Sequence, residues 1–259
     1  MDHYGPASVD AGPGMQVPPH PHIGLQTLTW LFEGEVIHRD SLGSEKVIRP
    51  GQLNLMTAGK GVAHSEQSVR HHGPRLHGLQ LWVALPDHSR RVDPSFQHLP
   101  ELPRTEVGGF QATVLAGSLA GVASPARSWS ELVGAELEAV GDTMGEIPLL
   151  PTHEHGVVLA QGHAVVAGTF LQPGRLLYLG PGREVLPISA RTTTRLLLFG
   201  GQPLGEPLLM WWNFVARTGE EIAQAVADWN AGRFGPVAGY PGPPLAAPAL
   251  DPVRLVARF

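Results

Sequence analysis

Residues 25–32 read Leu25-Gln26-Thr27-Leu28-Thr29-Trp30-Leu31-Phe32, a run rich in β-branched and aromatic side chains. The run stops at Glu33-Gly34, and an apolar pair resumes at Val36-Ile37. This order is typical of two strands joined by a turn. The same pattern predicts further short strands, at 52–56, 79–84, 112–116, 156–160, 164–167, 176–179 and 195–199. Short strands separated by Gly and Pro favour a β-sandwich or a β-barrel.

The two halves of the chain carry similar features in the same order. The first half contains, in sequence, His20-Pro21-His22, Gly34-Glu35-Val36 and Pro50-Gly51-Gln52-Leu53. The second half contains His153-Glu154-His155, Gly162-His163-Ala164 and Pro173-Gly174-Arg175-Leu176. An ordered set of matches indicates a duplicated unit. We therefore expect two β-barrels in tandem, an N-terminal one over residues 1–107 and a C-terminal one over residues 108–259.

The end of the chain has a different pattern. Thr218-Gly219-Glu220-Glu221 has the form of a capping box, and apolar residues follow at helical spacing from Ile222 to Trp229. Gly232 is a stop signal. We expect one short amphipathic helix packed on the second barrel. Residues 236–252, rich in Pro, Gly and Ala, are predicted to run extended over the surface.

Composition excludes several classes of function. The 259 residues carry a formal net charge of -5 without a dense Lys/Arg cluster, which argues against nucleic-acid binding. Zero Cys excludes disulfides, iron–sulfur clusters and cysteine-bound zinc, so any metal must be held by His and carboxylates. We find no apolar run long enough to span a membrane and no signal peptide. We expect a cytoplasmic monomer.

Two pairs of polar residues stand out in the first half. On a strand, residues two apart point to the same face, which places His20 beside His22 and His64 beside Glu66. Two such strands facing each other inside a barrel would supply four converging ligands. Three imidazoles and one carboxylate suit divalent Fe, Mn, Co, Ni, Cu or Zn, and they leave coordination positions open for chemistry. The pattern predicts one metal ion held by these four residues.

The second half offers an internal comparison. Counting from Pro173 as from Pro50 places Pro187 and Ser189 where His64 and Glu66 stand in the first half. The second barrel is thus expected to lack the opposing ligand pair. His153-Glu154-His155 is interpreted as a remnant, as polar surface residues or as contacts at a second site, rather than as metal ligands.

Other histidines receive plainer interpretations. His38 is expected to be a hydrogen-bonded histidine at a strand end. His71, His72 and His77 are predicted to lie in an exposed loop near the entrance to the metal site.

Several motifs of this chain together resemble those of the pirin family. They are His20-Pro21-His22-x-Gly24-x-Gln26-Thr27, His38-Arg39-Asp40-Ser41, the run from Met56 to Glu66, and the late Trp212-Asn213-Phe214-Val215-Ala216-Arg217. The resemblance covers nearly the whole chain. It implies an all-β fold of two cupin (jelly-roll type) β-barrels in tandem, with a short C-terminal helix. It also implies that only the N-terminal barrel holds iron(II) or another divalent metal, with the family's ligands mapping onto His20, His22, His64 and Glu66.

Two positions depart from the broader pattern. Gln26 stands where the general cupin motif has a Glu ligand, which fits the family's use of Glu66 instead. Pirins usually carry some tens of residues before the segment that resembles Met1 to Pro6. Either the start was assigned too far downstream, which we favour and which predicts an in-frame continuation upstream, or this form lacks β-strands that normally complete the assembly.

The resemblance also implies an activity. In pirin-type quercetinases, the 3-hydroxyl of a flavonol such as quercetin binds the metal, and O2 opens the heterocycle with release of carbon monoxide. Glu66 would then be both a ligand and the general base. The alternative is a non-enzymatic regulator that binds a transcription factor or a metabolic enzyme according to the metal's oxidation state. Storage or isomerase chemistry is permitted by the ligand set alone.

Overall fold

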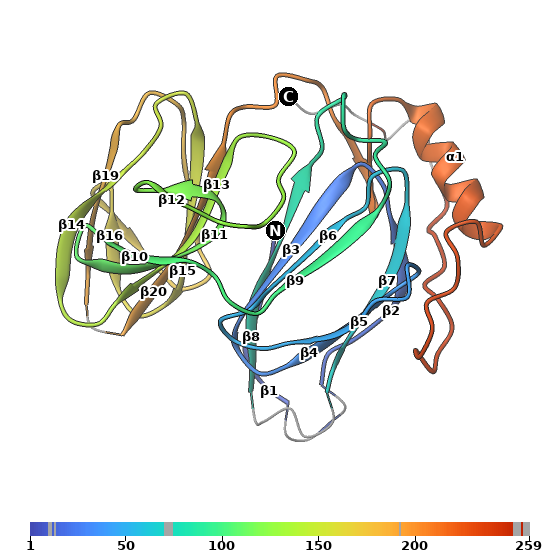
Figure 1. Ribbon diagram of the computed structural model, residues 1–259, viewed down its shortest axis with the longest axis horizontal. Helices are drawn as coiled ribbons and strands as arrows, with labels where there is room; N and C mark the ends of the chain where they lie inside the picture. Colours follow the sequence, from blue (N-terminus) through green and yellow to red (C-terminus); the bar gives the residue numbers. More distant parts are fainter. Residues whose placement is uncertain (10–11, 13, 70–74, 192, 251–254, 256–259) are drawn as a thin grey trace. The chain divides into compact units, whose positions relative to one another are not determined.

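The computed structural model describes residues 1–9, 12, 14–69, 75–191, 193–250 and 255 (Figure 1). It divides into two compact units, one formed by Met1–Pro100 with Gly205–Phe259 and the other by Glu101–Leu204. Both units are built almost entirely from antiparallel strands, as expected. Within the described ranges, no helix is long and apolar enough to cross a membrane.

The barrel of the first unit is formed by two sheets. In spatial order, the first sheet comprises β1 (Asp2–Ser8), β8 (Arg75–Ala84), β3 (Leu25–Glu33), β6 (Leu53–Thr57) and β9 (Ser95–Leu99). The second comprises β2 (Gln16–His22), β7 (Val62–Ser68), β4 (Val36–Asp40) and β5 (Glu45–Ile48). Alternation is clear on β4, where Val36, His38 and Asp40 are buried while the residues between them are partly exposed. Because alternate side chains on a strand point to the same face, the polar side chains of His38 and Asp40 are directed into the barrel.

The second unit repeats this order. One of its sheets contains β10 (Arg104–Val107), β11 (Phe110–Leu119), β13 (Leu132–Ala139), β20 (Thr194–Gly201), β15 (Glu154–Gln161) and β18 (Leu176–Leu179), with β12 (Val122–Ala123) paired to β11. The other contains β14 (Thr143–Pro148), β19 (Val185–Ala190), β16 (Ala164–Val166) and β17 (Thr169–Leu171). The order β14-β19-β16-β17 matches β2-β7-β4-β5, and β13-β20-β15-β18 matches β1-β8-β3-β6. The duplication predicted from the sequence is confirmed.

The tail folds back onto the first barrel. It forms β21 (Leu209–Trp211), β22 (Phe214–Ala216) and α1 (Gly219–Asn230), whose first turn is capped by the Thr218 side chain as predicted. Phe214 forms a parallel bridge with Ile23, and the Val215 amide donates to the Ile23 carbonyl at 3.2 Å. Gly24, at φ +69°, makes room for this approach, because an added Cβ would collide with the Val215 carbonyl.

This packing corrects two expectations. The helix does not pack on the second barrel: its buried residues, Ile222 and Ala225, join a cluster that contains Phe214 and the partly buried Ile23. The expected division at residues 107 and 108 therefore assigns the tail to the wrong barrel, since residues 205–259 group with the N-terminal unit. The physical reason is tertiary: an amphipathic stripe shows that a helix needs a partner but does not say which one.

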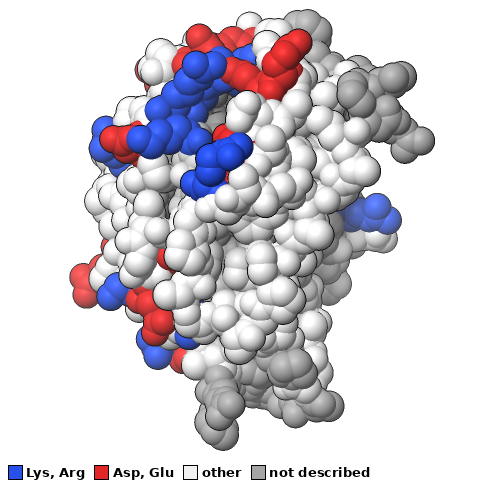
Figure 2. All heavy atoms as spheres, turned by 90° about the vertical axis from the view of Figure 1, so that its right-hand side faces the viewer, with Lys and Arg blue, Asp and Glu red and all other residues white. Residues whose placement is uncertain are grey.

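Charged side chains around α1 pair with one another. Figure 2 shows that basic and acidic groups lie side by side on this face and that most of it is uncharged. Glu221 of α1 accepts from both Arg90 and Arg91, and Arg233 pairs with Asp228. Glu221 thus ties the helix to the loop after β8.

Candidate metal centre

The four sequence-predicted ligands lie on two neighbouring strands. His20 and His22 come from β2, and His64 and Glu66 come from β7, where His20 is directly opposite His64. All four side chains are buried, none more than 7% exposed. The two strands are hydrogen-bonded neighbours in one sheet, so the expectation that they face each other across the barrel is wrong. The register still places His20 and His64 close together, because directly opposed side chains on adjacent strands lie near each other.

Three imidazoles converge tightly. The ring centroids of His20, His22 and His64 lie 4.3 to 4.9 Å apart. One ring nitrogen from each lies within 4.8 Å of the others. The Nε2 atoms of His22 and His64 are 3.0 Å apart.

Backbone carbonyls set the orientation of two of these rings. The Nδ1 of His20 lies 2.9 Å from the Pro18 carbonyl, and the Nδ1 of His22 lies 3.0 Å from the Asn213 carbonyl. A carbonyl only accepts, so each Nδ1 donates its hydrogen and each Nε2 presents a lone pair. This is the tautomer that metal-binding histidines commonly adopt. Asn213 comes from the returning tail, which thereby completes the site.

His64 is oriented by a chain of side chains. Its Nδ1 lies 3.4 Å from the Nδ1 of His38, whose Nε2 lies 3.1 Å from the Asp40 carboxylate. Asp40 is an acceptor, so the Nε2 of His38 donates to it, which leaves the His38 Nδ1 to accept from His64. His64 then also presents a lone pair at Nε2. The His38 ring is further held by stacking on Phe96.

These contacts test whether the residues fit a metal. The lone pairs of His22 and His64 face each other at 3.0 Å, an arrangement that is repulsive unless a cation lies between them. A cation with metal–nitrogen bonds of about 2.1 Å and ligands at right angles holds its nitrogens about 3.0 Å apart. The donor set therefore fits a divalent ion.

Burial keeps the imidazoles in the form that binds metals. Desolvation lowers the pKa of His20 to about 4, against a smaller opposing contribution from its bond to Pro18. It also holds the pKa values of His22 and His64 well below the usual range. The three rings are thus uncharged at neutral pH, with lone pairs available.

Glu66 has a different environment. It belongs to a second group of potential ligands with His38 and His64, and both its carboxylate oxygens lie 2.9 Å from the Nε2 of Gln80, which donates to them. Burial raises the pKa of Glu66, while His38 and the hydrogen bonds from Gln80 and Thr29 act in the opposite direction. Buried carboxylates with a raised pKa are suited to proton transfer near neutral pH.

Several contributors were missed in the sequence or placed wrongly. Asp40, Gln80 and Asn213 were given no role in the predicted site, although the spacing of His38 and Asp40 repeats the two-residue pattern of the ligand pairs.

Of the three histidines expected in an exposed loop, His71 and His72 lie outside the described residues. His77 contradicts the expectation: it is buried on β8, with its Nε2 2.8 Å from that of His3.

Strand register identifies the corresponding positions in the second barrel. Val36 lies two residues after Gly34 and pairs with Ser68. In the second barrel, Ala164 lies two residues after Gly162 and pairs with Ala190. Following the ladders from these pairs, the positions of His20, His22, His64 and Glu66 correspond to Ile147, Leu149, Leu186 and Ile188. All four are buried in the aliphatic core.

The sequence comparison had misaligned the repeats. Counting from Pro173 selects Pro187 and Ser189, whereas strand register selects Leu186 and Ile188, one residue earlier in each case. The count fails because the loops of the two copies differ in length. His155 corresponds by register to Thr27 rather than to His22. His153 and His155 are not surface residues either, since each is only 2% exposed.

Family models match both parts of the chain. A model described as Pirin matches residues 1–83, and one described as Pirin C-terminal cupin domain matches residues 134–235. Among similar proteins, one from Pseudomonas aeruginosa, provisionally named quercetin 2,3-dioxygenase, is 46% identical over 96% of this chain and 80% of its own length. A pirin-like protein from Caulobacter vibrioides is 43% identical over 90% of this chain and 83% of its own.

The fold also matches solved structures. A crystal structure of quercetin 2,3-dioxygenase from Acinetobacter baumannii superposes with a TM-score of 0.94 at 44% sequence identity. The match covers 98% of this chain and 85% of that one.

Proposed function

Because the chain belongs to the pirin family, we propose that it is a metal-dependent dioxygenase acting on flavonols such as quercetin. His20, His22, His64 and Glu66 are the proposed ligands. The observation that carries this proposal is the 3.0 Å approach of the His22 and His64 Nε2 atoms inside a buried barrel. We propose iron(II) as the ion, although the donor set also accepts Ni, Mn, Co, Cu or Zn.

The residues around the site suit the first step of flavonol cleavage. A bound ion would supply a Lewis acid for the flavonol 3-oxygen and a binding position for O2. Glu66 takes the proton of the 3-hydroxyl, which leaves a flavonolate that can react with O2. Both oxygen atoms of O2 enter the ring-opened ester, and one ring carbon leaves as carbon monoxide.

Neighbouring side chains support this role of Glu66. Gln80 holds both carboxylate oxygens, so the base stays directed into the barrel. The burial that raises its pKa makes Glu66 a stronger base than an exposed carboxylate. His38 and Asp40 hold the ring of His64, which lies in both ligand groups.

The test is aerobic turnover of quercetin by the iron-loaded protein. We expect the flavonol absorbance band to disappear with release of carbon monoxide. Glu66→Gln should lose most of this activity, whereas His88→Ala, at an exposed histidine of the same barrel, should retain it. An unchanged band over a panel of flavonols, with bound metal confirmed by elemental analysis, would reject the enzyme and favour the regulatory alternative.

A further inference from the structure

A cavity of about 900 Å³ opens at one end of the second barrel, apart from the proposed metal centre. Its lining residues all lie between Gly117 and His155, within the second unit. They come from the end of β11, the start of β13, the end of β14 and the start of β15. The mouth of a β-barrel is a common place for small-molecule binding.

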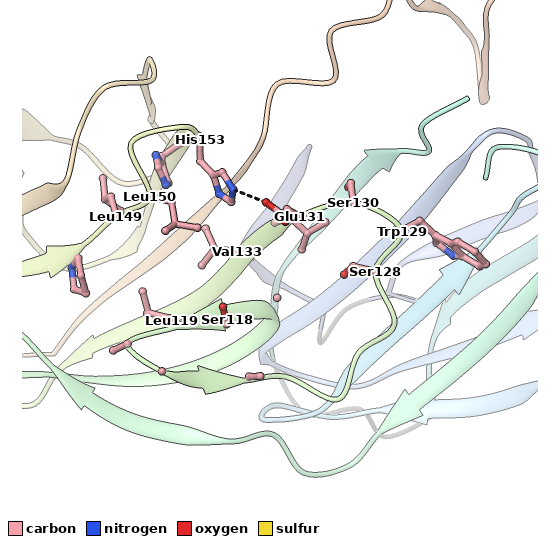
Figure 3. A pocket seen from close by; sticks show the side chains of 17 residues that line it. Ser118, Leu119, Ser128, Trp129, Ser130, Glu131, Val133, Leu149, Leu150 and His153 are labelled. Atoms are coloured by element: carbon pink, nitrogen blue, oxygen red, sulfur yellow. Dashed lines mark ion pairs between the residues drawn. The ribbon is translucent and has the colours of Figure 1, made fainter. Parts of the chain in front are cut away.

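Two buried histidines in this cavity have unused hydrogen-bonding capacity. Neither ring nitrogen of His153, nor the Nδ1 of His155, has a hydrogen-bond partner in the part of the chain that the structure describes. Figure 3 shows His153 directed toward Glu131, but the Nε2 to Oε2 distance is 3.8 Å, too long for a hydrogen bond. Buried polar nitrogens without partners are rare in folded proteins and indicate a missing partner.

The setting makes these histidines unusual within their own barrel. The positions that correspond to the proposed metal ligands are aliphatic here and belong to a large apolar core. Among the described residues, the pair belongs to no group of three potential metal ligands that all lie within 4.8 Å of one another. The two imidazoles therefore form a polar feature at the mouth of the second barrel that differs from the converging ligand group of the first.

The lining defines the chemistry of a ligand. Its walls are largely apolar, with Leu119, Val133, Leu149 and Leu150 among them (Figure 3). Glu131 is the single charged side chain among the described lining residues, so an anion would find no cationic partner. A neutral imidazole both donates and accepts, which matches a hydroxyl group. Burial lowers the pKa of His155 and so favours its neutral form.

We propose that this cavity binds an uncharged, mostly apolar small molecule through a hydroxyl group held by His153 and His155, with a phenol as the simplest member of the class. The aromatic body packs against the leucines and Val133, while the hydroxyl is a hydrogen-bond partner for one ring nitrogen of each histidine. This site is independent of the flavonol chemistry proposed for the first barrel.

The test uses the full chain with ¹⁵N-labelled histidine side chains, titrated with phenol and observed by NMR. Phenol should shift the ring nitrogens of His153 and His155. Toluene, which lacks the hydroxyl, and benzoate, which adds a charge, should bind at least ~10-fold more weakly, a ratio equal to about 1.4 kcal/mol. Signals of His20, His22 and His64 report separately on any binding in the first barrel.

Variants complete the design. His153→Leu and His155→Leu should each weaken phenol binding by ~10-fold or more, whereas His163→Leu, at a histidine outside the cavity, should not. Ser130→Trp places an indole ring in the cavity from its partly exposed rim without altering either histidine, so it should weaken phenol binding in a fully folded protein. The proposal is overturned if phenol leaves the His153 and His155 signals unchanged, or if toluene binds as well as phenol.

Discussion

His64 and His38 meet through their Nδ1 atoms at 3.4 Å, and His38 continues to Asp40 through a 3.1 Å contact. The register of β4 against β7 creates this chain, because it places His38 opposite Glu66 and Asp40 opposite His64. All the members are buried, so water does not compete for these hydrogen bonds. The proposed metal centre is thus supported from β4 as well as from β2 and β7.

His38→Leu removes the acceptor for the Nδ1 of His64. We expect metal affinity to fall by about 10–100-fold, the usual effect of losing a group that orients a ligand. Competition with a chromophoric chelator measures this. His38→Asn, whose amide oxygen can accept, should recover part of the affinity; equal affinities for wild type and His38→Leu would show that the chain does not position His64.

Gln80→Leu removes both short hydrogen bonds from the Glu66 carboxylate. Because these bonds favour the charged form, the pKa of Glu66 should rise further above its usual value. A base acts when deprotonated, so the acidic limb of the pH profile of kcat/KM should move to higher pH. Thr29→Val, which removes a longer contact of 3.5 Å, is the graded control and should move the limb less. A limb that stays in place would argue against Glu66 as the base.

Phe214→Ala tests the link between the tail and the site. Phe214 is fully buried, and such a truncation typically costs about 3–5 kcal/mol of stability. The variant should also bind metal more weakly, since the neighbouring Asn213 carbonyl orients His22. Thermal unfolding and metal titration together measure both effects. Phe170→Ala, at an exposed phenylalanine of the second barrel, should change neither.

Glu221 should make the stability of the first unit depend on acid pH. Burial raises its pKa, but hydrogen bonds from the Arg217 amide, Arg90 and Arg91 outweigh this effect and lower it from 4.5 to about 2. A lowered folded-state pKa stabilises the protein above pH 4.5, and this stabilisation is lost as the pH falls toward 2.

Glu221→Gln should therefore lower the free energy of unfolding at pH 7 by about 1–3 kcal/mol, after allowance for the partial exposure of the pairs. Urea titrations across this pH range measure the difference between the two proteins. It should shrink toward zero near pH 2; a difference independent of pH would assign the effect to packing instead.

Much of the fold could be predicted from the sequence because strand signals are local. The predicted strands at 79–84, 112–116 and 156–160 lie within β8, β11 and β15. The central strand β13 was missed, since Gly134, Ala135 and Ala139 have low strand propensity. Its pairing with both β11 and β20 makes it a strand despite its composition.

The sequence by itself determined which ligand candidates share a strand face, because side-chain alternation with a period of two depends only on the local backbone. His20 with His22, and His64 with Glu66, follow from it. Only the tertiary structure decided what surrounds them: Asn213 reaches His22 from 191 residues away, and Gln80 reaches Glu66 across the barrel. It also placed His153 and His155 in a separate cavity, because strand register depends on pairing between distant segments and loop lengths alone do not specify it.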